Sequence, residues 1–368
     1  MMLDEAIKIL HQIDDAGYIA YIVGGYVRDY LLGIESNDID ITTNATPKEL
    51  QEIFSDSVIK TTDYGSITIM VKNIRYEITT FRKEIKYTDH RRPEEIEYVN
   101  DLYTDLNRRD FTINSICMDE NKEVFDFLNG KEDIDKRLIN SIGNASLKFE
   151  EDALRILRAV RFATTLNFEL SDEVREAIVE KKNLLKSLSY ERKKEELDKI
   201  FASPNVKKGI ELLLELGLDK PLELNKLKNI NNTDSLISVW AMLDVLNIYP
   251  FTNAEKEVIE EITAVMGDNN LDPYILYKYG LYVNSVAGAI KGLDKKDITE
   301  KYDDLAIKVR DDINISAQEI MDILDKEPGK YISDIYNDLE KEIIYNRLEN
   351  NNDKLKKYVE ENYQGVEC

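Results

Sequence analysis

The sequence contains few of the residue types that build disulfide frameworks and soft metal sites. Its 368 residues include two cysteines, Cys117 and Cys368, and two histidines, His11 and His90. Two cysteines so far apart do not predict a disulfide framework or a zinc site. Two histidines likewise argue against a histidine-ligated metal.

Long apolar runs are also absent from the sequence. No stretch of about eighteen apolar residues occurs, so no membrane span is expected. The first residues, MMLDEAIKIL, form an acidic amphipathic pattern without the basic and apolar regions of a signal peptide. We therefore expect a cytoplasmic protein that does not bind membranes.

Basic charge is scarce in the chain as a whole. The formal net charge is −23, which by itself argues against a nucleic-acid partner. The deficit is uneven, because residues 151–215 carry 13 basic and 13 acidic side chains and are neutral as a segment. A polyanion would be expected to contact a local basic surface there. The candidate lysines for that surface are Lys193, Lys194, Lys207 and Lys208.

The chain changes character near residue 145. Before residue 140, stretches rich in Val, Ile, Thr and Tyr predict short strands mixed with helices. After residue 145, apolar residues recur with helical periodicity almost throughout, ending in what is predicted to be a solvated helical tail at 339–363. The sequence therefore predicts an α+β domain followed by an all-α remainder. The expected strands lie within 18–25, 38–43, 66–71 and 75–81, and the expected helices within 150–166, 171–188, 189–203, 207–217, 233–246, 253–266 and 316–326.

Two aspartates lie close together in SNDIDITT (36–43). Asp38 and Asp40 are separated by Ile39, and in an extended strand side chains two residues apart point to the same face. Two like charges in one small space cost energy unless a cation lies between them. A bare pair of this kind is often only an acidic turn, so the surrounding residues decide between the two interpretations.

Residues on either side of the pair suit phosphate and metal chemistry. Upstream, Gly24 and Gly25 separate a strand from a helix that carries Arg28. Such a turn exposes N–H groups to a phosphate, although a purely structural turn is the alternative. Downstream, Glu77 in RYEITTFR lies on a strand that could pair with the aspartate strand. It could complete a Mg²⁺ site for phosphoryl transfer, or remain a solvated strand residue.

A further polar segment, LNRRDFTINSICM (106–118), places charges directly before apolar residues that predict a helix. Arg109 is a candidate for binding a triphosphate. Asp110 and Asn114 could orient a ribose or brace the arginines. The alternative is a salt-bridge cluster, which is the preferred interpretation for Arg108.

Taken together, these segments resemble one known family. VGGYVRDYLLGIESNDIDITT, RRDFTIN and EEDALRILRAVRFATTLNFEL, in this order and spacing, are similar to the motifs of class II tRNA nucleotidyltransferases. These are the bacterial CCA-adding enzymes and their poly(A) polymerase relatives in the polymerase β-like superfamily. The resemblance covers roughly residues 18–200 and fades toward the C-terminus. It implies an α+β nucleotidyltransferase head of mixed sheet and helices (1–145), followed by an all-α neck (146–215), body (216–290) and tail (291–368).

The resemblance also implies roles for individual residues. Asp38 and Asp40 match the metal-binding aspartates of the family. Gly25 and Arg28 match its phosphate-binding turn, and Arg109 matches a nucleotide-contacting arginine. The residues that match its nucleotide-selecting helix are Asp152, Arg155, Arg158 and Arg161.

The chemistry of that last motif can be argued directly. Steps of three residues place the four side chains on one side of a helix. Cytosine and adenine each present an exocyclic amino donor beside a ring-nitrogen acceptor, so an aspartate can accept from the first and an arginine can donate to the second. Uracil and guanine present the opposite order and would leave both protein groups unpaired, at about 1–3 kcal/mol per group in a buried site. Asp152 and Arg155 could thus select C and A without a template, unless the motif is only an exposed ladder of salt bridges.

A last segment, YTDHRRPEEIEYV (87–99), resembles the family's flexible loop. In the family this loop is linked to the switch from C to A addition, and here it contains Asp89 and Arg92. Its presence favours full CCA addition.

The expected function is therefore template-independent addition of C, C and A to the 3′ end of tRNA. CTP and ATP would be the substrates, Mg²⁺ the cofactor and pyrophosphate the product. Ser115, where the related enzymes often have alanine, is one small indication of the alternative of a poly(A) polymerase or an A-adding enzyme. The modest length and the lack of a basic C-terminal extension count against that alternative. A catalytically inactive RNA-binding protein is an alternative of a different class, and the intact Asp38 and Asp40 argue against it.

Overall fold

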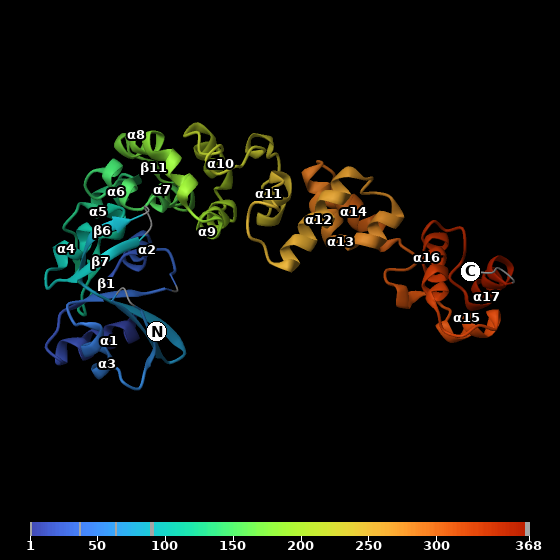
Figure 1. Cartoon of the computed structure of the whole chain (residues 1–368), viewed down its shortest axis with the longest axis horizontal. Coiled ribbons are helices and arrows are strands. Elements are labelled where there is room, and N and C mark those ends of the chain that lie inside the picture. The colour runs from blue at the N-terminus through green and yellow to red at the C-terminus, as the bar shows by residue number, and fades with distance from the viewer. Residues whose placement is uncertain (1, 37, 63–64, 89–91, 365–368) are drawn as a thin grey trace. The chain divides into compact units, whose positions relative to one another are not determined.

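The computed structural model describes residues 2–36, 38–62, 65–88 and 92–364, with the backbone alone at 86–88 and 92–94. The chain divides into two compact units, Met1–Lys228 and Asn229–Cys368, here called unit 1 and unit 2 (Figure 1). Unit 1 contains strands and helices, whereas the described part of unit 2 is helical. This confirms the predicted order of an α+β domain followed by an all-α remainder.

Unit 1 is built on a mixed sheet. Within the described residues, seven strands form it in the spatial order β3-β4-β5-β2-β1-β8-β9. Neighbouring strands are antiparallel except β2 and β5, which are parallel. Strands β6 and β7 form a separate antiparallel hairpin, and β10 and β11 form a short parallel pair. The strands are β1 (Ala20–Val23), β2 (Asp40–Thr43), β3 (Val58–Thr61), β4 (Ser66–Val71), β5 (Ile74–Thr80), β6 (Arg82–Thr88), β7 (Arg92–Tyr98), β8 (Cys117–Met118), β9 (Val124–Phe125), β10 (Leu138–Ile139) and β11 (Glu169–Leu170).

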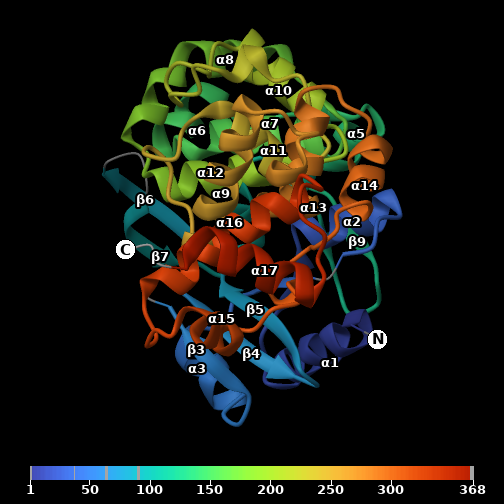
Figure 2. The same cartoon turned by 90° about the vertical axis from the view of Figure 1, so that its right-hand side faces the viewer.

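The four strands predicted from the sequence are confirmed as β1, β2, β4 and β5. In β5, Tyr76, Ile78 and Thr80 are buried, while Arg75 and Glu77 are exposed. This period-two pattern leaves one face of β5 covered and the other face open. The hydroxyl of Tyr76 donates to the carbonyl of Met2 in the first helix at 3.1 Å, and Figure 2 shows α1 and α3 beside this part of the sheet.

Helices pack against the sheet and form most of the rest of unit 1. The second one, α2, ends at Gly33, whose left-handed backbone (φ +69°) favours glycine. The third, α3, begins with a Thr46–Glu49 capping box and Pro47 in its first turn. The helices are α1 (Met2–Asp15), α2 (Gly25–Leu32), α3 (Pro47–Ile53), α4 (Leu102–Asn107), α5 (Gly130–Asp135), α6 (Ala145–Glu151), α7 (Leu154–Thr165), α8 (Asp172–Lys181), α9 (Tyr190–Phe201) and α10 (Val206–Glu215), with 3₁₀ turns at Thr112–Asn114, Lys182–Ser187 and Leu227–Asn229.

Two of the local predictions for unit 1 are wrong. The helix expected over 150–166 is interrupted, because Asp152 is extended (φ −141°) and its side chain accepts the Leu154 N–H at 3.0 Å. A short acidic side chain that bonds a nearby backbone N–H competes with the helix in this way. The helix expected after Asp110 is also absent from the described chain, where residues Thr112–Asn114 form a 3₁₀ turn that leads into β8.

Unit 2 is a series of helices. Trp240 packs against Tyr249 and Phe251 with ring centroids 5.2 Å apart in each case. Helix α13 is broken at Gly280 (φ +70°, ψ 174°). The helices are α11 (Leu236–Leu243), α12 (Asn253–Gly267), α13 (Pro273–Ile290), α14 (Lys295–Asp303), α15 (Ala317–Leu324), α16 (Lys330–Ile344) and α17 (Asn352–Tyr363), with a 3₁₀ turn at Arg310–Asp312.

The end of the chain is not the solvated helix that the sequence suggests. The segment 339–363 divides into the end of α16 and the whole of α17. Its residues Leu339, Ile343, Leu355 and Val359 are fully buried in an apolar cluster of unit 2. The high charge of this segment concealed that apolar face.

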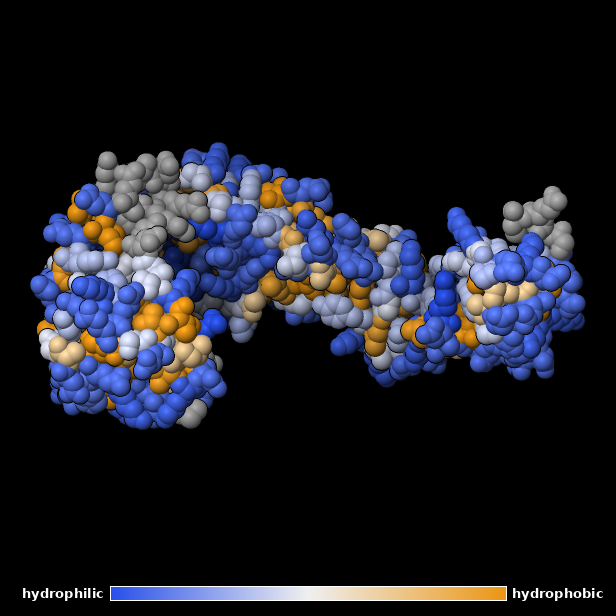
Figure 3. Space-filling view, turned by 60° about the horizontal axis from the view of Figure 1, so that its bottom comes forward, coloured by the Kyte–Doolittle hydropathy of each residue, from blue (hydrophilic) through white to orange (hydrophobic). Residues whose placement is uncertain are grey.

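None of the described helices is both long and apolar enough to cross a membrane. Hydrophilic residues dominate the face of the molecule in Figure 3, and apolar residues lie among them in small patches.

Candidate functional site

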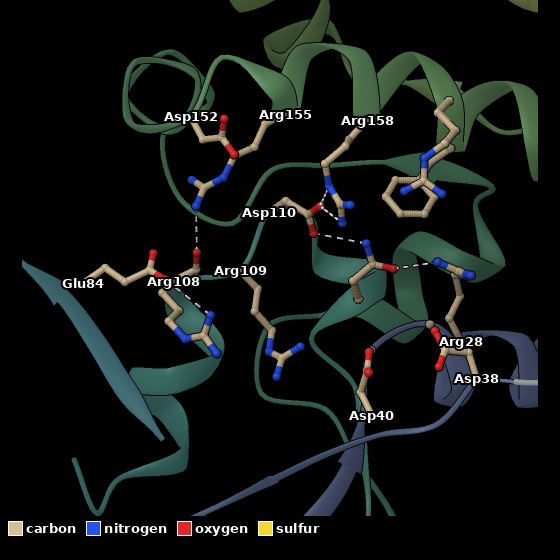
Figure 4. A pocket seen from close by; sticks show the side chains of 15 residues that line it. Arg28, Asp38, Asp40, Glu84, Arg108, Arg109, Asp110, Asp152, Arg155 and Arg158 are labelled. Atoms are coloured by element: carbon tan, nitrogen blue, oxygen red, sulfur yellow. Dashed lines mark hydrogen bonds and ion pairs between the residues drawn. The ribbon is translucent and has the colours of Figure 1, made fainter. Parts of the chain in front are cut away.

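A cavity of about 470 Å³ lies in unit 1, between the first turn of α2, the start of β2 and helix α7. Figure 4 shows α7 along one side of it, with Asp38 and Asp40 on the opposite side. Most of the site residues predicted from the sequence line this one cavity. They are Gly25, Arg28, Asp38, Asp40, Arg109, Asp152, Arg155, Arg158 and Arg161.

The aspartate pair lies at the edge of the sheet. Asp40 is the first residue of β2, and Asp38 precedes the strand and is exposed. Between them Ile39 is fully buried, as predicted, and anchors the segment in the core. Burial, together with the charge of Asp38, raises the pKa of Asp40 to about 6. The charges of Arg109 and Arg158 act in the opposite direction but do not outweigh burial and the repulsion from Asp38.

The turn formed by Gly24 and Gly25 lines the same cavity. Gly24 has φ +80°, a conformation that favours glycine, and it lies directly before α2. A Cβ atom on Gly24 would lie 3.5 Å from Nη1 of Arg109 and 3.9 Å from Oδ2 of Asp40. The turn therefore brings backbone, arginine and aspartate together at the N-terminus of a helix, a common environment for anions.

A chain of hydrogen bonds crosses the cavity from α2 to α7 (Figure 4). Arg28 donates to Asn114 at 2.7 Å, and Asn114 donates to Asp110 at 3.1 Å. Arg158 donates to the second carboxylate oxygen of Asp110 at 2.6 Å. Burial raises the pKa of Asp110, but the charge of Arg158 and the Asn114 hydrogen bond outweigh it and hold that pKa well below its usual range. Asp110 and Asn114 thus brace the arginines, one of the two roles considered for them.

An aromatic ring that the sequence analysis overlooked organises the arginines. Phe162 is buried on α7 and lines the cavity. The guanidinium carbons of Arg28, Arg158 and Arg161 lie 5.2, 5.3 and 4.0 Å from its ring centroid. Stacked guanidinium groups keep their charge while losing freedom of movement. An aromatic residue directly after Arg161 in an arginine-rich helix was the signal in the sequence.

A second overlooked residue is Asp105, which has no exposed surface. Its carboxylate accepts hydrogen bonds from Arg108 at 2.8 Å, Arg109 at 3.4 Å and Thr42 at 3.2 Å. Arg108 also lies 3.5 Å from Glu84, so its preferred interpretation as part of a salt-bridge cluster is confirmed. In the described structure the Nε of Arg109 is buried and has no hydrogen-bond partner. The i+3 and i+4 spacing from Asp105 to the arginines could have identified this hub.

The proposed base-reading residues lie at the start of α7. Both carboxylate oxygens of Asp152 accept from Nη2 of Arg192, at 3.2 and 3.1 Å. Arg155 donates to Glu151 at 2.7 Å and to the carbonyl of Arg108 at 2.9 Å. Asp152 is not on the helix itself, yet Figure 4 shows its side chain close to that of Arg155. Arg192 was not identified from the sequence.

Other predicted residues lie outside the cavity. Glu77 is the register partner of Asp40 in the parallel β2–β5 pair, but its exposed side chain lines a neighbouring hollow. Asp89 lies outside the described residues. Arg92 begins β7, where the expected loop is partly a hairpin strand, and only its backbone is described.

The neck lysines predicted to approach phosphates differ in their exposure, and Ser115 lies in the core. Lys193 is 1% exposed and lies over the ring of Tyr190, so the prediction that it approaches a phosphate is wrong. Lys194 is also buried and is paired with Asp198. Lys208 is paired with Glu169, whereas Lys207 is exposed. Ser115 is buried, donates to the carbonyl of Thr112 and does not line the cavity.

The donor set of the aspartate pair suits a hard cation. Among the described residues, no group of three or more histidine, cysteine, aspartate or glutamate side chains is arranged to hold a metal ion. Asp38 and Asp40 provide oxygen ligands only. Mg²⁺ commonly binds one or two carboxylates and takes its other ligands from substrate phosphates and water. The pair therefore fits Mg²⁺ better than a metal that requires a complete protein cage.

Three family descriptions match the chain in succession. "Poly A polymerase head domain" matches residues 20–140, "Probable RNA and SrmB-binding site of polymerase A" matches 167–227, and "tRNA nucleotidyltransferase domain 2 putative" matches 240–359. The chain is 33% identical to the CCA-adding enzyme of Ligilactobacillus salivarius, over 97% of both chains. It is 34% identical to that of Bacillus pumilus, over 96% of both chains.

Solved structures show the same similarity. The CCA-adding enzyme of Bacillus stearothermophilus in complex with CTP matches with a TM-score of 0.85 and 28% identity, over 97% of this chain and 96% of that one. The Thermotoga maritima CCA-adding enzyme complexed with tRNA shares the fold, with a TM-score of 0.67 and 20% identity, over 97% of this chain and 94% of that one.

Proposed function

The chain belongs to the class II tRNA nucleotidyltransferases, the family of the CCA-adding enzymes, and we propose that the cavity of unit 1 is where it carries out the family's reaction. The enzyme adds C, C and A to the 3′ end of tRNA from CTP and ATP and releases pyrophosphate. One observation carries the assignment of the site. The aspartate pair, the phosphate-binding turn and the base-reading pair all line the same cavity.

We assign a separate role to each of four parts of the chain. The head (1–145) holds the metal and the triphosphate, and the neck (146–215) selects the base. The body (216–290) and the tail (291–368) hold the tRNA. Because tRNA, CTP and ATP meet in the cytoplasm, we place the enzyme there.

In the reaction, the 3′-hydroxyl oxygen of tRNA forms a bond to the α-phosphorus of the nucleotide. The bond between the α-phosphorus and the bridging oxygen breaks, pyrophosphate leaves, and the hydroxyl proton passes to solvent. A Mg²⁺ ion held by Asp38 and Asp40 would supply Lewis-acid activation of the hydroxyl and neutralise phosphate charge. Glu77, on the strand paired with β2, is the proposed third carboxylate.

The triphosphate is proposed to lie against the turn before α2. Gly25 begins α2 and offers backbone N–H groups at the positive end of the helix. Arg109, with its Nε buried and unpartnered among the described atoms, is the arginine best able to gain a phosphate as a partner. Arg28 and Arg158 are already bonded to Asn114 and Asp110, so they supply positive charge at fixed positions.

Selection of the base is assigned to Asp152 and Arg155. Asp152 is held by Arg192 and can accept from the exocyclic amino group of C or A. Arg155 is held by Glu151 and the Arg108 carbonyl and can donate to the ring nitrogen. U and G would place donors and acceptors in the opposite order, which leaves polar groups unpaired.

The test uses tRNA that lacks its last three nucleotides, with Mg²⁺ and CTP or ATP, alone or together. CTP alone should add two residues, and a third should appear only when ATP is present. Long tails with ATP alone would overturn CCA addition in favour of a poly(A) polymerase. A wild-type protein as inactive as its Asp40→Ala variant would point instead to an RNA-binding protein.

A further inference from the structure

A second hollow adjoins the cavity on the other side of the aspartate pair. It has a volume of about 410 Å³ and is lined by Asp38, Ile59, Lys60, Thr68, Arg75 and Glu77. Asp38 lines both spaces, whereas the arginines of the cavity line only the first. A molecule in the hollow would thus meet a molecule in the cavity at Asp38.

The strand register explains how the hollow is formed. Lys60 on β3 is the register partner of Thr68 on β4, and Thr68 is the partner of Glu77 on β5. Glu77 is in turn the partner of Asp40 on β2. Register partners place their side chains on the same face of a sheet, so these four residues form one row across it. Arg75 lies two residues before Glu77 and shares that face.

This row lies on the open face of the sheet. The opposite face of β5 carries Tyr76 and Ile78, which are buried, and Tyr76 is bonded to α1. Lys60, Arg75 and Glu77 are exposed. Within the residues that the structure describes, neither Lys60 nor Arg75 forms an ion pair. Two exposed, unpaired cations beside a catalytic carboxylate, in a protein of net charge −23, indicate an anionic ligand.

We propose that the hollow holds the 3′-terminal phosphodiesters of the tRNA, with Lys60 and Arg75 as their charge partners. This inference rests on the proposed function, because it assumes that the cavity holds the nucleotide. The attacking and leaving oxygens of a phosphoryl transfer lie roughly in line across the phosphorus. The hydroxyl therefore approaches the α-phosphorus from the side opposite the leaving pyrophosphate. With the pyrophosphate held at the turn before α2, that is the β5 side of β2, where the hollow lies.

The chemistry of the hollow fits an RNA backbone better than a second nucleotide. Lys60 and Arg75 extend from β3 and β5 on the same sheet face, both are exposed, and both side chains carry only donors, which suit phosphate oxygens. Long, exposed cationic side chains bind phosphates without sequence selection. Because the RNA end changes from the discriminator nucleotide to C and then to CC, a backbone contact suits all three additions.

The test is a cycle that combines protein variants with a change in one phosphate. The RNA is tRNA lacking its last three nucleotides, either unmodified or with a neutral methylphosphonate at the last internucleotide linkage. The proteins are wild type, Lys60→Met and Arg75→Met. Addition of the first C is measured as kcat/KM, together with KM for CTP. Lys48→Met, an exposed lysine on α3 that lines neither space, is the matched control.

Each of the two variants should lower kcat/KM for unmodified tRNA roughly tenfold, with KM for CTP unchanged. The methylphosphonate should lower kcat/KM of wild type and of Lys48→Met roughly tenfold as well. For at least one of the hollow variants, Lys60→Met or Arg75→Met, it should leave kcat/KM almost unchanged. Such loss of additivity is the signature of a direct contact. Restoring the charge with Lys60→Arg or Arg75→Lys should recover much of the activity and the sensitivity to the methylphosphonate.

Binding provides a readout independent of chemistry. Measured by fluorescence anisotropy without divalent cations, the affinity of a hollow variant for the same tRNA should depend less steeply on salt. The slope of log K against log salt should fall by about 0.7 per lost contact with a single strand. An unchanged slope together with an undiminished methylphosphonate penalty in both variants would overturn the inference, while CTP addition by wild type would leave the proposed function standing. Failure of wild type to add C would overturn both.

Discussion

The two sides of the aspartate pair differ in how their cations are held. On the cavity side, Arg28, Arg158 and Arg161 are each within 2.7 Å of a carboxylate oxygen, from Asp29, Asp110 and Glu196 respectively. On the hollow side, Lys60 and Arg75 are exposed and unpaired among the described residues. A nucleotide that must be distinguished from close analogues requires fixed groups, whereas an RNA end that advances after each addition requires adaptable ones.

The largest effect is expected where the two sides meet. Asp40→Asn should lower kcat by about a thousandfold or more, because it removes a charged ligand from the proposed Mg²⁺ site. KM for CTP should change little, since the groups proposed to bind the triphosphate and the base remain. The variant should fold normally because it relieves a repulsion with Asp38. Single-turnover kinetics and a thermal melt in metal-free buffer measure these effects. A large rise in KM for CTP would show that Asp40 serves binding rather than chemistry.

Glu77→Gln tests whether the hollow side takes part in the chemistry. As the proposed third carboxylate, Glu77 should contribute about a hundredfold to kcat, and its loss should also raise the Mg²⁺ concentration needed for half-maximal rate. Its side chain lines the hollow and not the cavity, so KM for CTP should stay constant. Wild-type kcat with an unchanged Mg²⁺ dependence would identify Glu77 as a solvated strand residue.

On the cavity side, Asp152→Asn should relax base selection. The amide can present a donor where the carboxylate presents only acceptors, so uracil gains a partner that it lacks in wild type. The ratio of kcat/KM for CTP to that for UTP should fall roughly fiftyfold. Asp56→Asn, an exposed change in unit 1, is the control. An unchanged ratio of kcat/KM for CTP to that for UTP would show that Asp152 does not read the base.

The fixed groups of the cavity also contribute to stability, which Asp110→Asn should reveal. The variant leaves Arg158 without its charge partner, and the free energy of unfolding should fall by about 2 kcal/mol at pH 7. The pKa of Asp110 is lowered in the folded protein. Its stabilisation is therefore fully present above the unfolded pKa of about 3.9 and is lost as pH falls through the folded value. Urea unfolding from pH 7 to pH 2 should show a constant difference between the two proteins down to about pH 4 and a shrinking difference below it. A difference that stays the same below pH 4 would contradict the role of the charge.

The difference between the two sides also explains what could be predicted from the sequence. Asp38, Asp40 and the arginines of α7 are ionisable residues at regular spacings, and such patterns are readable because chemistry constrains both residue type and spacing. Arg192 and the contact of Phe162 with Arg28 were missed because they join segments that are distant in the chain. Asp152 was placed on a helix because its competing bond to the Leu154 N–H leaves the apolar period intact.

The strand register could not be predicted from the sequence either. The pairing of β2 with β5 could be suggested from alternation, but the row from Lys60 to Asp40 depends on the register of three pairs of strands. A shift of one residue in any pair would turn a side chain to the other face. The buried face of α16 and α17 was hidden for a related reason, because tertiary burial there uses few apolar residues among many charged ones.

The smallest expected effect tests whether base selection requires Asp152 to be held in a fixed orientation. Arg192 contacts both oxygens of Asp152 but does not line the cavity, so it should act only through that carboxylate. Arg192→Met should lower the preference for CTP over UTP about fivefold, because Asp152 keeps its acceptors but loses its fixed orientation. Since the effect passes through one residue, the double variant with Asp152→Asn should discriminate no worse than Asp152→Asn alone. Measuring the four kcat/KM ratios completes the cycle. Additive losses would mean that Arg192 contributes to selection by another route, and an unaltered ratio in Arg192→Met would mean that Asp152 is oriented by the nucleotide itself.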